Sequence, residues 1–355
     1  MRARHRGKLT HYYLDTGAKP RKEIPLGNDY VEAVRKWAEL TISAIPATAK
    51  ITFRMVAERY TREVMLQKAK GTQRKNMNEL AQLLKFFDDR QESIDSIQPV
   101  MVRQYLEWRR AGIVTEIKQK NASRAAAGLP IIELTGKEGQ VAANRDKALL
   151  SHIWNFARGA GLTSLANPCA GIKGYREDGR DVYIDDEILA AVYEAAGQGL
   201  RDALDLAYLT GQRPADTLKF SRAHIKEGAL EIQQNKTKTR LRIEIVGEFA
   251  TVMNRISSRR VTGLGLVSND DGQQMTAYML RYAFETARSK AAAENPSIRD
   301  AILKFQFRDL RAKAGTDIEN ERGIDAAQAQ LGHSTSTMTA HYVRHRRGKL
   351  VKPTK

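Results

Sequence analysis

The chain of 355 residues contains a single cysteine, Cys169. One cysteine excludes an internal disulfide and argues against a cysteine-based zinc site. No apolar run approaches the roughly 18 residues that a membrane span needs. The N-terminal stretch MRARHRGKLTHYY is basic but has no apolar run behind it, so it does not resemble a signal peptide. These absences predict a protein of a reducing cytoplasm with no membrane partner.

Negative charge is also scarce relative to positive charge. Lysine and arginine number 59 against 41 aspartates and glutamates, which gives a formal net charge of +18. A surplus of this size favours a polyanionic partner, and nucleic acid comes first because each neutralised phosphate releases counterions. Charge alone leaves two alternatives open, an anionic membrane surface and a basic ribosome-associated role.

The pattern of polar and apolar residues changes twice along the chain. This predicts three domains, at 1–45, 50–172 and 180–355. In the first domain bases alternate with tyrosines, and Asp15-Thr16-Gly17 predicts a turn between two short strands, followed by a helix. A basic ribbon with aromatic rings suits a DNA groove. The DNA contacts predicted for this small module are Tyr12, Tyr13, Arg21 and Lys22.

The second segment, 50–172, has helical periodicity without strand patterns. Met77, Leu80, Leu84 and Phe87 follow the spacing of a buried helix face. A further helix is predicted to begin at Pro99 and to stop at Gly112, with a polar loop and a short hairpin after it. The expected fold class of the whole chain is mainly α, with an α+β third domain.

In the third segment, 180–355, the stretch GALEIQQNKTKTRLRIEIV alternates apolar and polar residues on both sides of its centre. This pattern predicts a β-hairpin. Its tip is basic and carries Lys236, Lys238 and Arg240. Taken alone, such a tip is most simply a solvated turn.

Just before the hairpin stands TGQRPAD, in which Gly211 ends one helix and Pro214 suits the first turn of the next. Arg213 is thereby held at a helix start, where free backbone N–H groups favour an anion. Asp216, three residues on, is expected to hold the guanidinium in place. An ordinary helix corner with a salt bridge is the alternative interpretation.

Two later stretches complete the set. In FQFRDLRAKAGTDI, Arg308 and Arg311 are three residues apart and can lie near one helix face. In LGHSTSTMTAHY, His333 follows a glycine and Tyr342 comes nine residues later, just before a run of bases. Exposed arginines and a structural tyrosine are the simpler alternatives for each stretch by itself.

In this order and at this spacing, TGQRPAD, QNKTKT, RDLR and LGHSTSTMTAHY resemble the catalytic motifs of the tyrosine recombinases, the phage integrase family. The resemblance covers 180–343. It extends more loosely to a helical, SAM-like core-binding domain, through ANRDKALLSHIWNFARGAG and NPCAGIKGYRE, and to an arm-type DNA-binding module at the N-terminus.

The resemblance implies a site-specific recombinase that breaks and rejoins DNA through a 3′-phosphotyrosine. The nucleophile would be Tyr342, and Lys236 would protonate the leaving 5′-oxygen. The groups implied to bind the phosphate are Arg213, Arg308, Arg311 and His333, with Asp216 in support. Neither a metal nor another cofactor is expected. The implied partners are double-stranded attachment sites, a homotetramer on DNA, and in some systems a host DNA-bending protein and an excisionase, in the nucleoid of a bacterial host.

There is one departure from the family pattern, because Arg308 stands where the family usually has histidine. An arginine still donates hydrogen bonds to phosphate but cannot accept a proton near neutral pH. We expect slower or differently tuned chemistry at this position. The alternatives left open are a catalytically impaired DNA-binding protein derived from an integrase, a type IB topoisomerase-like enzyme, and a ribosome-binding protein, which would need no Tyr342. The attachment sequence and the home element, phage or genomic island, are not encoded in these motifs.

Overall fold

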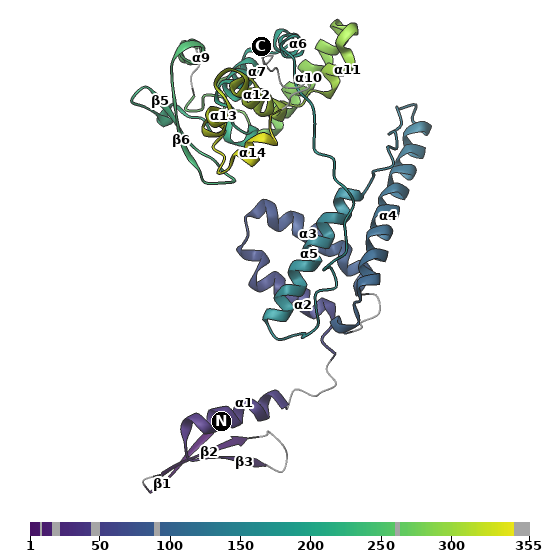
Figure 1. Cartoon of the computed structure of the whole chain (residues 1–355), viewed down its shortest axis with the longest axis vertical. Helices are drawn as coiled ribbons and strands as arrows, with labels where there is room; N and C mark the ends of the chain where they lie inside the picture. The colour runs from purple at the N-terminus through teal and green to yellow at the C-terminus, as the bar shows by residue number, and fades with distance from the viewer. Residues whose placement is uncertain (8, 16–21, 44–49, 89–92, 260–262, 344–355) are drawn as a thin grey trace, which may run out of the picture. The chain divides into compact units, whose positions relative to one another are not determined.

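The computed structural model describes residues 1–7, 9–15, 22–43, 50–88, 93–259 and 263–343 (Figure 1). The chain divides into two compact units, Met1–Asp178 and Gly179–Lys355. No helix in the described ranges is long and apolar enough to cross a membrane.

The first unit begins with a three-stranded antiparallel sheet in the order β1-β2-β3, followed by one helix. The elements are β1 (Arg2–Arg6), β2 (Leu9–Asp15), β3 (Glu23–Gly27) and α1 (Tyr30–Ser43). Leu26 of β3 and Ala33 of α1 are buried between sheet and helix. The sequence pattern predicts a two-stranded hairpin and a helix, and the structure adds β1 as a further strand. The turn expected at residues 16 and 17 lies outside the described residues.

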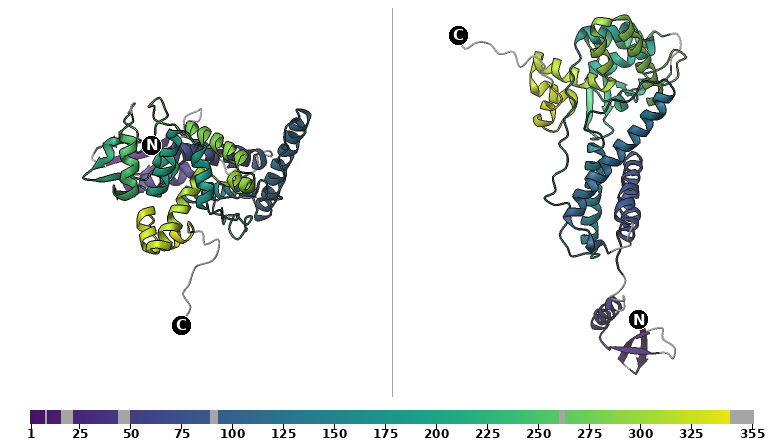
Figure 2. Two further views of the ribbon diagram at one scale, coloured as in Figure 1. Left: turned by 90° about the horizontal axis from the view of Figure 1, so that it is seen from above. Right: turned by 90° about the vertical axis from the view of Figure 1, so that its right-hand side faces the viewer.

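The rest of the first unit is helical (Figures 1 and 2). Its helices are α2 (Phe53–Glu63), α3 (Lys70–Phe87), α4 (Pro99–Ala126) and α5 (Gln140–Gly159). Trp154 of α5 and Tyr105 of α4 are fully buried in a shared core with Phe53 and Phe87. The Tyr105 hydroxyl donates to the buried Asp146 at 2.8 Å, and Arg109 binds the same carboxylate oxygen at 2.8 Å, so the one buried acid of α5 is paired.

Two predictions about these helices are wrong. The helix from Pro99 does not stop at Gly112 but continues to Ala126. A glycine inside a helix costs only about 1 kcal/mol. The segment after α4 runs back along it and offsets that cost, because Asn121 bonds both the N–H and the carbonyl of Ile132 at 2.7 Å. Met77 is exposed, and Leu83 takes the core position on α3 instead.

The second unit is a helical body with a small sheet, in the order β4-β5-β6. Its longer helices are α6 (Asp186–Glu194), α7 (Gln198–Thr210), α9 (Gly247–Ser257), α10 (Ala277–Glu294), α12 (Leu310–Arg322) and α13 (Ile324–Leu331). Its short helices are α8 (Pro214–Thr217), α11 (Arg299–Lys304) and α14 (Ser336–Ala340). Its strands are β4 (Ile225–Lys226), β5 (Ala229–Gln233) and β6 (Arg240–Glu244). The predicted hairpin is confirmed, with Leu230 opposite Ile243 and Ile232 opposite Leu241.

Helix α12 is the central support of this unit. It packs against both α7 and α13, and Lys313 on it is almost fully buried. Lys313 pairs with Asp317 at 3.0 Å and with Asp186 at 2.5 Å, and Tyr208 of α7 donates its hydroxyl to Asp317 at 2.8 Å. These partners satisfy a buried charge that would otherwise be costly. The start of α12, which carries the arginine motif, is therefore firmly attached to α7.

Candidate active site

Arg213 stands at the corner between α7 and α8. Helix α7 ends at Gly211, whose φ of +64° is a left-handed conformation that glycine adopts easily. An added Cβ there would lie 3.0 Å from the Leu331 side chain, so glycine also allows α7 to approach the end of α13. Pro214 then begins α8, and Arg213 has extended backbone immediately before it. The predicted corner is confirmed, and the Arg213 side chain is 20% exposed.

The hairpin tip is tied to this corner by Gln234, which is fully buried. Its amide nitrogen donates to Gln212 Oε1 and to the Leu331 carbonyl, both at 2.8 Å. Its amide oxygen accepts from Arg213 Nη1 at 3.3 Å and from the Thr237 hydroxyl at 2.7 Å. One side chain therefore joins three elements and helps to orient Arg213.

Asp216 makes the predicted ion pair with Arg213 and a second contact with the hairpin tip. It is buried, but its Oδ2 lies 4.0 Å from Arg213 Nη1, at the outer limit of an ion pair. Its Oδ1 accepts the backbone N–H of Asn235 at 2.8 Å. In this structure Asp216 chiefly anchors the hairpin tip to α8, and Gln234 makes the nearer contact with the Arg213 guanidinium.

Arg311 lies at the base of the site, with only 2% of its surface exposed. Its guanidinium donates to the carbonyl of Gly211 at 2.8 Å and to that of Leu331 at 2.7 Å. Its Nη2 also lies 2.8 Å from His333 Nε2, and its buried Nε has no hydrogen-bond partner among the described residues. Burial, and then the nearby Arg213 charge, lower the pKa of Arg311 to about 10, so the group remains charged at neutral pH. Two guanidinium groups this close favour an anion beside them.

Arg308 lies three residues before Arg311 but in a different environment. It belongs to a short turn, Phe307–Asp309, at the start of α12, and its side chain is exposed. The next residue, Asp309, is buried and receives two hydrogen bonds of 2.6 Å from Arg180. The turn is thus held firmly, while the Arg308 side chain extends into solvent.

The basic groups of the hairpin tip are exposed as well. Lys236, Lys238 and Arg240 all lie on the surface, and Lys238 has a φ of +60°. The structure therefore confirms a basic tip. It does not bring the Lys236 side chain into the hydrogen-bond network around Gln234.

His333 follows α13 directly. Gly332 has a φ of +64° and closes that helix, and an added Cβ would lie 2.9 Å from Gln234 Nε2. The His333 side chain is 6% exposed, and its Nδ1 lies 3.1 Å from the Thr339 hydroxyl. Burial, together with the charges of Arg311 and Arg213, lowers the pKa of His333 to about 4. The imidazole is therefore neutral at physiological pH.

Tyr342 follows the short helix α14 and is half-buried. Its backbone N–H donates to the Thr339 carbonyl at 2.8 Å. Its ring centroid lies 4.9 Å from that of His333 and 5.2 Å from Arg311 Cζ, the distance of a cation–π contact. The structure thus brings together Arg311, His333 and Tyr342, which the sequence separates by up to 31 positions.

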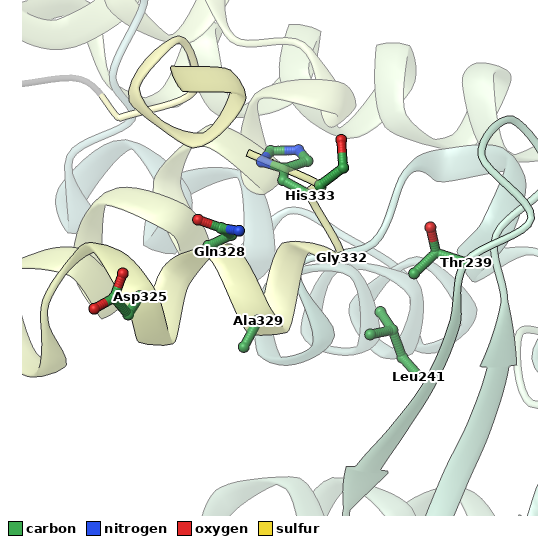
Figure 3. Close-up of a pocket in the computed structure, with 8 residues that line it drawn as sticks. Thr239, Leu241, Asp325, Gln328, Ala329, Gly332 and His333 are labelled. Carbon is green, nitrogen blue, oxygen red and sulfur yellow. The ribbon is translucent and has the colours of Figure 1, made fainter. Parts of the chain in front are cut away.

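A cavity of about 430 Å³ opens beside His333 (Figure 3). It lies between α13 and the start of β6. Thr239 and Leu241 line it from the hairpin, and Asp325 and Gln328 line it from α13. This open, partly polar recess lies next to the buried cationic cluster around Arg311. No group of three or more histidine, cysteine, aspartate or glutamate side chains among the described residues is placed to hold a metal ion.

The DNA-binding residues predicted near the N-terminus belong to the first unit. Tyr12 packs against Tyr30 with ring centroids 5.6 Å apart, and Arg4 lies over the Tyr13 ring at 5.4 Å. Lys22 is exposed, and Arg21 lies outside the described residues. Both tyrosine rings thus have packing partners within the small module.

Sequence reasoning missed Gln212, Gln234 and Thr339. The two glutamines lie inside the quoted motifs TGQRPAD and QNKTKT, one directly before Arg213 and one two residues before Lys236. That adjacency is the only sequence signal for them, because a polar residue gives no indication of burial by itself. Thr339 is one of several hydroxylated residues before Tyr342, and only the fold distinguishes it from the others.

Comparison with known proteins gives consistent matches. Residues 186–348 match the family described as the phage integrase family. The integrase of Escherichia phage HK022 is 23% identical over 357 residues, which cover 95% of this chain and 91% of that protein. A crystal structure of a lambda integrase tetramer bound to a Holliday junction matches with a TM-score of 0.66 at 18% identity, over 98% of this chain and 95% of that one. The Tn1549 transposon integrase, solved with circular intermediate DNA, matches with a TM-score of 0.57 at 17% identity, over 83% and 96%.

Proposed function

This chain is a tyrosine recombinase of the phage integrase family, and we propose that Tyr342 is the nucleophile with which it cuts and rejoins DNA at specific sites. The observation that carries the proposal is the cluster in which the Tyr342 ring lies against both Arg311 and His333. A tyrosine among buried cationic and imidazole groups is a poor core residue. It is well placed to attack a phosphate that those groups bind.

The cleavage step follows from the groups present. The Tyr342 oxygen forms a bond to the scissile phosphorus, and the bond from phosphorus to the 5′-oxygen breaks, which leaves a 3′-phosphotyrosine. Arg311 and Arg213 bind the non-bridging oxygens, where charge builds up in the transition state. Lys236 supplies the proton that the departing 5′-oxygen needs. Rejoining reverses these steps with the 5′-hydroxyl of a partner strand, so the bond energy is conserved.

The burial of Arg311 supports its part in this step. Its hydrogen bonds to two backbone carbonyls hold the guanidinium in place before any phosphate arrives. A donor held in advance does not have to be ordered during the reaction, and for this reason such groups stabilise transition states effectively.

We further propose a role in DNA binding for each of the three predicted domains. Residues 1–45 would bind arm-type sites through Tyr12, Tyr13, Arg21 and Lys22. Residues 50–172 and 180–355 would together bind the core site. Within 180–355, the hairpin would contact DNA through Lys238 and Arg240. Four protomers would act together on two duplexes, as in the lambda integrase tetramer bound to a Holliday junction. A host bending protein and an excisionase would set the direction of recombination in the nucleoid of the bacterial host.

Covalent trapping tests the proposal. Purified protein is mixed with a nicked duplex that carries the junction sequence flanking its own gene, and a denaturing gel reports the protein–DNA adduct. We expect an adduct from the unmodified protein and none from Tyr342→Phe. Tyr278→Phe is the matched control, because this tyrosine of α10 is 76% exposed and should retain the full adduct yield. An adduct that persists in Tyr342→Phe would refute the assignment. DNA binding with no adduct from any form would instead indicate an impaired DNA-binding protein.

A further inference from the structure

Thr339 is in contact with both His333 and the turn that carries Tyr342. It is fully buried, and its hydroxyl lies 3.1 Å from His333 Nδ1. Its carbonyl accepts the backbone N–H of Tyr342 at 2.8 Å. Its neighbours on α14, Thr337 and Met338, are exposed. Of these three consecutive residues, Thr339 alone is buried against the imidazole.

The directions of the hydrogen bonds determine which His333 nitrogen carries the proton. A guanidinium only donates, and Arg311 Nη2 lies 2.8 Å from His333 Nε2, so Nε2 accepts. A neutral imidazole that accepts at Nε2 carries its hydrogen on Nδ1, which then donates to the Thr339 hydroxyl. That hydroxyl lies 3.4 Å from the Thr335 carbonyl, which can accept its hydrogen in turn. Each group therefore donates a hydrogen bond to the next, from Arg311 through His333 and Thr339 to the Thr335 carbonyl.

The surroundings of His333 keep the ring uncharged. Arg311 faces it from α12, Arg213 from the start of α8, and Tyr342 from the turn after α14. Asp325 and Gln328 of α13 line the cavity beside the ring. Burial and the two guanidinium charges lower the pKa of His333 to about 4, so the neutral ring predominates at physiological pH.

We propose that Thr339 is a positioning residue that holds His333 in the tautomer with an accepting Nε2, and that this nitrogen receives the Tyr342 proton during strand cleavage. The inference rests on the proposed function of Tyr342. When a phosphate oxygen takes the Arg311 N–H, His333 Nε2 is left without a donor. The negative charge of that phosphate also offsets the two guanidinium charges and so favours the protonated ring. The proton then moves from the Tyr342 oxygen to Nε2 as the oxygen–phosphorus bond forms, and it returns when the strand is rejoined.

This assignment differs from the donor role that the family resemblance implies for His333. It also accounts for Arg308. A charged guanidinium cannot take a proton from Tyr342, and Arg308 occupies the position where the family usually has histidine. In this chain the neutral imidazole that lies next to Tyr342 is that of His333.

The test compares variants of the full chain in single-turnover adduct formation across a range of pH. Thr339→Val keeps the shape and removes the hydroxyl, so adduct formation should slow by roughly tenfold, the scale of one buried hydrogen bond. Thr339→Ser keeps the hydroxyl and should remain within about threefold of the unmodified protein. Thr337→Val is the matched control, because it makes the same change on the exposed side of α14 and should have no effect.

The pH profile gives a readout that a merely structural role would not change. The unmodified protein should lose activity as the pH falls through the pKa of His333, because an imidazolium cannot accept a proton. This loss of rate at low pH is the acid limb of the profile. In His333→Gln the acid limb should be absent, and the rate should be low at every pH. An unchanged acid limb in His333→Gln, or full activity of Thr339→Val at every pH, would overturn the inference.

A direct measurement does not depend on how the variants fold. Long-range ¹⁵N–¹H spectra of the unmodified protein, with His333 assigned from the His333→Gln variant, report which ring nitrogen carries hydrogen. We expect Nδ1–H, and a resonance pattern for Nε2–H or for the imidazolium at neutral pH would refute the inference. The outcomes are distinct from those for the nucleophile. If Tyr342→Phe still forms adduct, the proposed function fails; if only Tyr342 behaves as expected, the Thr339 inference fails alone.

Discussion

The candidate site has two parts that differ in how they are held. The buried part consists of Gln234, Arg311 and His333, whose side chains are 0%, 2% and 6% exposed. The exposed part consists of Lys236 and Arg308, which extend into solvent. Hydrogen bonds to backbone carbonyls order the buried part before DNA arrives. Ordering an exposed lysine or arginine costs up to about 2 kcal/mol of side-chain entropy, which DNA binding has to offset. The buried part is therefore organised in advance, and we expect DNA binding to order the exposed part.

The sharpest test of this contrast is the same substitution in both parts. Arg311→Lys should slow adduct formation by roughly a thousandfold, the upper range for a lost transition-state donor, because an ammonium cannot reach both carbonyls and the phosphate together. Arg308→Lys, at the exposed position, should cost roughly tenfold or less. Single-turnover rates at saturating DNA measure both. Equal losses at the two positions would remove the distinction between the parts.

The second prediction concerns Lys236 and isolates its role as proton donor. Lys236→Ala should slow cleavage by roughly a hundredfold, the lower range for a lost general acid. A substrate with sulfur in place of the bridging 5′-oxygen has a leaving group that needs no proton. Cleavage of this substrate by Lys236→Ala should therefore approach the rate of the unmodified protein.

The matched control for Lys236 is Lys238→Ala on the same hairpin tip. It should weaken DNA binding and show no preferential gain with the sulfur substrate. If the sulfur substrate does not restore cleavage in Lys236→Ala, the lysine acts by binding DNA and not by supplying a proton.

The third prediction concerns the acid stability of the DNA-free protein. The folded-state pKa of His333 is about 4, below the ordinary value of 6.5, so between these values the unfolded chain binds a proton that the folded chain does not. Stability should therefore fall as the pH is lowered through this window, and the contribution is fully present above about pH 6.5. His333→Gln should lose roughly 3 kcal/mol less than the unmodified protein between pH 7 and pH 4.

Thermal denaturation at several pH values measures this difference, with the same substitution at the exposed His341 as control. Parallel stability curves for His333→Gln and the unmodified protein would show that the imidazole is accessible to protons in the folded state. The buried part of the site would then be more open than its hydrogen bonds indicate.

The smallest effect is expected at Arg308. Arg308→His restores the residue usual for the family at an exposed position, so stability should change by no more than about 0.5 kcal/mol. Adduct formation should be equal or faster, since a histidine can share the acceptance of the Tyr342 proton. Denaturation curves and single-turnover rates test both statements. A total loss of cleavage would show that Arg308 has become essential in this chain.

The local predictions that the structure confirms depend on strong short-range signals. The alternating stretch around the basic tip forms β5 and β6, and Gly211 ends α7 in a left-handed conformation. The predictions that failed depend on long-range packing. Gly112 does not stop α4, because the following segment folds back along the helix, and Met77 is exposed although it has core spacing.

The order and spacing of the four motifs carried the resemblance to the tyrosine recombinases, and that resemblance selected the arginines, the histidine and the tyrosine as candidate site residues. The sequence does not show which of these side chains are buried, or which atoms donate and accept the hydrogen bonds between them. Whether Arg311 is enclosed while Arg308 extends into solvent depends on α7, the hairpin tip and α13 meeting at Gln234 and Leu331. The protonation state of His333 depends on Arg311 and Thr339, which come from two other elements. Such properties arise only when segments far apart in the chain are packed together, because dielectric environment and partners are set by neighbours in space.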